Sequence, residues 1–277
     1  MRIKKRSAVL LGLATAGALA TAGIAWAAGY TTVTMDFSPS ALAPPGTGYT
    51  SGKLSLHTHT SYTNPGNSIP GGALSRAQVY WDDDIRFNTD AVPKCPLSSI
   101  SGKNMQQAMA ACGTSLVGSG TVKAMVTDDP NSPGEAPGYF VNGCLRVFNG
   151  QGPASELLLY ARTQVSDPST ISCSTNGTQG NFTRVFPGDL TANPGTAGAD
   201  FADPDNCTAP IRLGCQLDVP NIDGIALIPL TEVNMNIQKG SFVAARCDDT
   251  PLQLNLKAIF TYNNSSTQTV NASKACT

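Results

Sequence analysis

The chain has 277 residues with 18 basic and 19 acidic side chains, and only 13% of its residues are charged. Beyond the first six positions the basic residues are spread thinly. This excludes the cationic patch that nucleic acids and anionic lipid surfaces require of a partner. Gly, Pro, Ser, Thr and Asn are abundant instead, a composition that favours turns and β-strands over helices.

Residues 1–27 have the pattern of a secretory signal peptide. Met1–Arg6 is basic, an apolar stretch rich in Ala and Leu follows, and Ala25–Ala27 is a small-x-small cleavage site. We expect cleavage after Ala27 or one residue later. Cleavage removes four of the 18 basic residues and leaves 14 against 19 acidic ones.

An uncleaved anchor helix is the alternative to cleavage. No later apolar run approaches the length that spans a bilayer, so we expect no membrane span once the signal peptide is removed. The expected location is therefore extracellular or in the cell envelope. Residues 28–277 are expected to form a single domain.

Alternation of apolar and polar residues, the pattern of half-buried strands, recurs along the mature chain. In the first such segment, Val33, Met35 and Phe37 share one face. Turn-rich stretches separate the segments. The predicted strands are Thr31–Phe37, Lys53–Tyr62, Leu74–Trp81, Thr121–Val126, Tyr139–Phe148, Glu156–Val165, Phe182–Phe186, Ile211–Val219, Thr231–Ile237, Phe242–Cys247 and Leu252–Tyr262.

One segment has helical periodicity instead. Met105, Ala108, Met109 and Cys112 recur at i, i+3, i+4 and i+7 and predict a short helix near 103–112. We expect Ser101 as its N-cap and Gly113 at its C-cap. Many strands and one short helix predict an all-β fold of two packed antiparallel sheets, a jelly-roll-like sandwich.

Eight cysteines lie between Cys95 and Cys276. An even number in an exported chain predicts disulfides, and eight cysteines allow 105 pairings. We expect Cys95 to pair with Cys112, because Cys112 lies on the helical stripe that faces the sheet and Cys95 follows the strand-like Ile85–Asn88. A distant partner for Cys112, or a free buried thiol, is the alternative.

His57 and His59 are the first candidate site. On a strand both imidazoles share one face, at a spacing that can chelate a metal ion. That face also carries Lys53, Ser55 and Ser61, so an ordinary solvated pair is the competing interpretation.

A calcium site is the second candidate. Asp200, Asp203 and Asp205 alternate in a turn-rich loop, and calcium prefers several oxygen ligands. The run Asp203–Cys207 resembles part of a thrombospondin type 3 calcium repeat, over barely eight residues and in one copy. A plain polar loop is the alternative, and no other cofactor is expected.

Catalytic motifs are absent from the sequence: there is no G-x-S-x-G, H-E-x-x-H, P-loop or G-x-G-x-x-G, and no catalytic residue is assigned. Carboxylates distant in sequence can still converge in a hydrolase. An enzyme would be favoured if two carboxylates converged in one cleft. The candidates are Asp82, Asp83, Asp84, Glu156 and Glu232.

The stretch from Asp82–Thr89 through Pro93–Cys95 to Cys112 and Val117–Gly120 resembles a group of uncharacterised secreted bacterial proteins. The resemblance covers about the middle third of the chain and implies export and a β-rich fold, with no activity attached. We therefore expect a non-catalytic secreted protein that binds an extracellular ligand or serves in the envelope. A secreted hydrolase with paired carboxylates is the alternative.

Overall fold

The computed structural model describes residues 30–40, 42, 48–61, 74–81, 84–126, 139–152, 155–163, 173, 182–191, 216–222, 230–247, 252–263 and 265–276. The expected signal peptide lies outside these residues. Within this part of the chain, none of the helices has the length and apolar character needed to cross a membrane.

The described residues are mostly strand, with one α-helix, as the sequence predicts. The helix α1 is Met105–Cys112, flanked by the 3-10 helices η1 (Leu97–Ser99) and η2 (Gly113–Ser115). The strands are β1 (Tyr30–Ser38), β2 (Thr50–Ser51), β3 (Lys53–Ser61), β4 (Leu74–Trp81), β5 (Ile85–Phe87), β6 (Leu116–Val126), β7 (Tyr139–Gln151), β8 (Ser155–Thr163), β9 (Phe182–Thr191), β10 (Gln216–Val219), β11 (Leu230–Ile237), β12 (Val243–Ala245), β13 (Gln253–Tyr262) and β14 (Thr267–Ala275).

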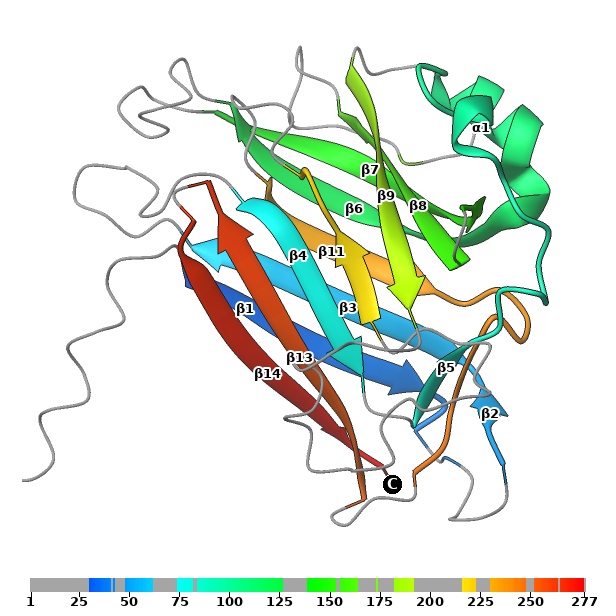
Figure 1. Ribbon diagram of the computed structural model, residues 1–277, viewed down its shortest axis with the longest axis vertical. Helices are drawn as coiled ribbons and strands as arrows, with labels where there is room; N and C mark the ends of the chain where they lie inside the picture. Colours follow the sequence, from blue (N-terminus) through cyan, green and yellow to red (C-terminus); the bar gives the residue numbers. More distant parts are fainter. Residues whose placement is uncertain are drawn as a thin grey trace, which may run out of the picture.

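Eleven of the strands form one antiparallel sheet in the order β1-β3-β11-β6-β7-β8-β9-β10-β4-β13-β14. This sheet curls until its first and last strands, β1 and β14, lie side by side, so it is nearly closed and barrel-like (Figure 1). The expected two-sheet sandwich differs from this arrangement. Alternation fixes which side chains point inward, but it does not distinguish two facing sheets from one sheet that curls around its own core.

Glycines and bulges allow the sheet to curl. A Cβ atom at Gly118 or Gly120 in β6 would lie 2.4 or 1.7 Å from a backbone oxygen of β11. The strand register also shifts on both sides of β6, between Leu230 and Glu232 and between Leu116 and Gly118. Bulges and strand glycines bend a sheet at defined positions, so β6 is a place where this sheet can curve.

Side chains join the two edge strands at the seam. The Gln268 side-chain amide accepts a hydrogen bond from the Thr31 backbone N–H at 2.8 Å and donates one to the Thr31 carbonyl at 3.0 Å. Lys274 of β14 forms an ion pair with Asp36 of β1 at 3.0 Å. One glutamine amide therefore occupies both backbone groups of an edge residue, as a neighbouring strand would.

A small second sheet, β2-β12-β5, covers one end of the interior. Phe87 of this sheet packs on Trp81 at the end of β4, with ring centroids 5.0 Å apart, and on Phe242, which immediately precedes β12, with ring centroids 6.2 Å apart. All three side chains are buried. This aromatic plug fills that end of the interior.

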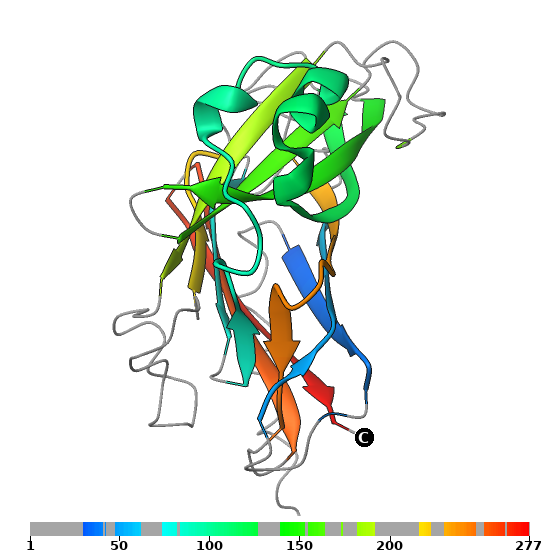
Figure 2. The ribbon, with the colours of Figure 1, turned by 90° about the vertical axis from the view of Figure 1, so that its right-hand side faces the viewer.

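Helix α1 lies outside the large sheet, against β7 and β8 (Figure 2). Its buried residues Met105, Ala108 and Cys112 form a second core with Phe148 and Tyr160 of those strands. The disulfide Cys95–Cys112 fastens the helix there, and this is the pair expected from the sequence. Further disulfides join Cys144 to Cys173 and Cys247 to Cys276.

The expected N-cap of this helix is wrong. Asn104, not Ser101, caps it: the Asn104 side chain accepts from the Gln107 backbone N–H at 2.9 Å, and the Gln107 side chain accepts from the Asn104 N–H at 3.1 Å. This reciprocal capping box satisfies two backbone donors at once, which Ser101, three residues earlier, cannot do. Gly113 is at the C-cap as expected, in a right-handed conformation.

Replacing Gly120 with alanine tests the curvature of β6. The added methyl group would lie 1.7 Å from the Asn234 backbone oxygen, so one of the two strands must shift. We expect the free energy of unfolding to fall by about 1–3 kcal/mol in urea denaturation of the oxidised protein. Ser119→Ala, on the outer side of the same strand, is the control and should change it by about 0.5 kcal/mol or less. Unchanged stability of Gly120→Ala would contradict the tight approach of β6 to β11.

Candidate functional site

A cavity of about 110 Å³ lies inside the barrel-like sheet. Strands from most of the sheet line it, so its wall is built from inward positions that are far apart in sequence. The lining residues are Leu56, Thr58, Leu74, Ala77, Val79, Val122, Leu145, Leu159, Ala161, Phe186, Leu217, Val219, Ile222, Leu230, Val233, Met235 and Phe260.

The cavity is a consequence of the number of strands. An eight-stranded barrel is just wide enough for its own side chains to fill, and the diameter grows with strand number. Eleven strands therefore enclose more space than inward side chains fill unaided. The aromatic plug fills one end, whereas the cavity wall has small side chains at Ala77 and Ala161. Protein interiors seldom contain voids larger than a water molecule, so this unfilled space stands out.

The described residues of the cavity wall are apolar except at one position. Among them, Thr58 in β3 is the one with a polar side chain, and none is charged. Its neighbours across the sheet are Val33 of β1 and Val233 of β11. An apolar cavity of about 150 Å³ stays dry and binds benzene or xenon, so a space of this character favours small apolar molecules over water.

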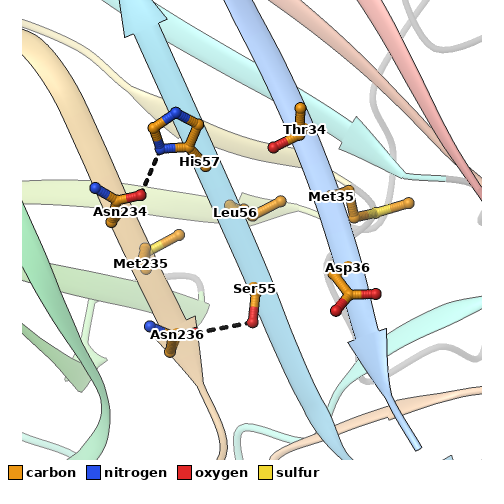
Figure 3. Close-up of a pocket in the computed structure, with 9 residues that line it drawn as sticks. All are labelled: Thr34, Met35, Asp36, Ser55, Leu56, His57, Asn234, Met235 and Asn236. Atoms are coloured by element: carbon orange, nitrogen blue, oxygen red, sulfur yellow. Dashed lines mark hydrogen bonds between the residues drawn. The ribbon is translucent and has the colours of Figure 1, made fainter. Parts of the chain in front are cut away.

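A second hollow, of about 130 Å³, lies on the outer face of β1, β3 and β11 (Figure 3). The imidazole Nδ1 of His57 is hydrogen-bonded to Asn234 Oδ1, and the Asn234 side-chain N–H donates to Glu232 Oε1 at 2.8 Å. Ser55 Oγ donates to Asn236 Oδ1 at 2.8 Å. Polar side chains of neighbouring strands thus satisfy one another across this surface.

The outer hollow lacks the geometry of nucleophilic catalysis. A serine nucleophile requires a histidine that takes its proton, but Ser55 donates to an asparagine. His57 and His59 lie on the outer face, as the solvated interpretation of the pair expects. Among the described residues, no group of three or more His, Cys, Asp or Glu side chains can hold a metal ion.

The described carboxylates of the hydrolase set are dispersed. Asp84 is fully buried and paired with Arg246 at 3.2 Å, near the small sheet. Glu232 is opposite Lys123 of β6, and Glu156 is opposite Gly150 of β7. Because Lys123 pairs with Asn142 of β7, Glu232 and Glu156 are separated by eight residues along that strand, about 26 Å. Asp82 and Asp83 lie outside the described residues.

One pair of carboxylates does meet. Glu156 of β8 is directly opposite Asp189 of β9, so both side chains lie on the outer face of the sheet, away from the cavity. Glu156 is 8% exposed, whereas Asp189 is exposed. Burial, reinforced by the negative charge of Asp189, raises the pKa of Glu156 above its ordinary value.

The expected calcium ligands Asp200, Asp203 and Asp205 lie outside the described residues, so this site stays a prediction. The cavity is not predicted by the sequence analysis, which assigns most of its lining residues to strands without estimating how well they fill the interior. The available signal is the small size of Ala77 and Ala161 at inward strand positions, where larger apolar residues are usual.

Comparisons with protein-family models, with curated proteins and with solved structures found no match to this chain.

The raised pKa of Glu156 predicts a pH dependence of stability. The folded protein binds this proton more tightly than the unfolded chain, so the contribution of Glu156 to stability falls as pH rises from about 4.5 through the raised folded value. Glu156→Gln should therefore have a higher melting temperature than the unaltered protein at pH 7, and this advantage should shrink towards pH 4.5.

The exposed Asp90→Asn is the control for loss of one carboxylate and should show no such advantage. A lower melting temperature of Glu156→Gln at pH 7 would mean that the carboxylate is stabilised in the folded protein, contrary to the burial argument.

Proposed function

We propose that this chain is a non-catalytic binding protein, exported to the extracellular space or the cell envelope, that holds a small apolar molecule inside its barrel-like sheet. The observation that carries the proposal is the cavity of about 110 Å³ with its almost wholly apolar wall. Ligand sites are typically concave and mostly apolar, with few polar groups.

Packing energetics supports a ligand rather than a structural role for the cavity. Residues around an unfilled apolar space lose packing contacts, so a space of this size lowers stability. A single substitution of Ala77 or Ala161 by a larger apolar residue would reduce the unfilled volume. Retention of the space is explained if a molecule occupies it, since ligand contacts then replace the missing protein contacts.

The disulfides support the proposed location outside the cytosol. Cys95–Cys112, Cys144–Cys173 and Cys247–Cys276 are bonds that persist in oxidising compartments outside the cytosol.

The paired-carboxylate hydrolase has less support, since Glu156 and Asp189 lie on the opposite face of the sheet from the cavity.

Filling the cavity tests the proposal. Benzene should raise the melting temperature of the mature, oxidised protein, because a ligand that binds only the folded state stabilises it. Ala161→Leu places a larger side chain in the cavity and should remove this shift while leaving the protein folded. Ala110→Leu makes the same change at an exposed position of α1 and should keep the shift.

Two outcomes would contradict the proposal. One is the lack of any benzene-induced shift in the unaltered protein. The other is an equal shift in Ala161→Leu and Ala110→Leu, because binding would then occur elsewhere.

A further inference from the structure

Among the described residues that line the cavity, Thr58 alone has a polar side chain. Thr58 is the residue between His57 and His59, so the strand alternation that sends the imidazoles outward turns this side chain inward. Both cross-strand neighbours, Val33 and Val233, are apolar. Among the described residues, the Thr58 hydroxyl has no hydrogen-bond partner.

The next inward residue of the same strand provides a comparison. The Thr60 hydroxyl is 3.0 Å from Thr31 Oγ1, which is 2.7 Å from the Tyr262 hydroxyl, and the latter donates to Gln268 Oε1 at 2.9 Å. Every hydroxyl of this network is satisfied within the protein, at the seam between β1 and β14. Thr58 differs from this network, because it lines the cavity and its hydroxyl makes no hydrogen bond to another described residue.

We propose that Thr58 binds a single polar atom of the ligand, which is therefore a small, ring-sized hydrocarbon with one hydroxyl or carbonyl oxygen, such as a simple phenol, alcohol or ketone. This inference rests on the proposed function and specifies the ligand class of the same cavity. A threonine hydroxyl both donates and accepts, so it can bind either kind of oxygen. A charged ligand is disfavoured, because no described residue of the wall is charged and could offset the loss of hydration of a charge.

The chemistry predicts discrimination between ligands that differ by one oxygen. A phenol oxygen that enters the cavity loses its bonds to water and regains one from Thr58, whereas benzene makes no such exchange. When Thr58 is changed to valine, which has nearly the same shape, phenol has to enter without a partner. The affinity for phenol should then fall about tenfold, whereas that for benzene should stay within about threefold.

Calorimetric titration of the mature, oxidised protein with benzene and with phenol tests the inference. Thr58→Val should lose phenol affinity selectively, and Thr58→Ser, which keeps the hydroxyl, should retain it. Thr60→Val is the matched control, because it removes a hydroxyl that is already bonded to Thr31; its ratio of phenol to benzene affinity should be unchanged. Benzene binding shows in each variant that the cavity is intact.

Ala161→Leu, with its cavity filled, should bind neither compound. If benzene binds but Thr58→Val leaves the phenol affinity unchanged, the role of Thr58 is overturned while the cavity remains a binding site. If neither compound binds to the unaltered protein, the proposed function itself is wrong, and the ligand class with it. Should Thr58→Val fail to fold, Thr58→Ala provides the same comparison.

Discussion

The near-closure of one sheet is the constraint on which the rest of the structure depends. An open sheet of eleven strands exposes two edges, each with a row of unpaired backbone groups that invites association with other chains. Here β1 and β14 lie together, and the amide of Gln268 satisfies the N–H and the C=O of Thr31. The ion pair of Asp36 with Lys274 joins the strands further along. Thr31 and Gln268, which close the sheet, are thus 237 residues apart in the sequence.

Closure on eleven strands determines the interior. Such a circumference encloses more volume than inward side chains fill, so the protein fills one end with Trp81, Phe87 and Phe242 and leaves a cavity between small side chains at another level. On the outer face, α1 and the Cys95–Cys112 disulfide cover the apolar residues of β7 and β8. Binding chemistry is accordingly expected inside the sheet, and the polar outer face around His57 forms hydrogen bonds among its own side chains.

The sequence predicts the strands well because their inward residues are large and apolar: Leu74–Trp81 has the bounds of β4, and Thr231–Ile237 lies within β11. It misses β14, whose inward positions include Gln268 and Lys274, polar residues that serve the seam rather than the core. Barrel-like closure cannot be predicted from the sequence either, since alternation does not show which strands are neighbours. The cavity is a property of the whole packed interior, and no local pattern encodes an unfilled volume.

Pressurising a crystal of the protein with xenon tests most directly whether the sheet encloses an apolar space able to accept a ligand. Xenon binds in dry apolar cavities without needing any specific polar contact. We expect a strong xenon peak within the cavity, close to Ala77, Leu159, Ala161 and Phe260, and its loss in Ala161→Leu. A cavity that holds hydrogen-bonded waters and no xenon, or one that is closed by repacked side chains, would contradict the account.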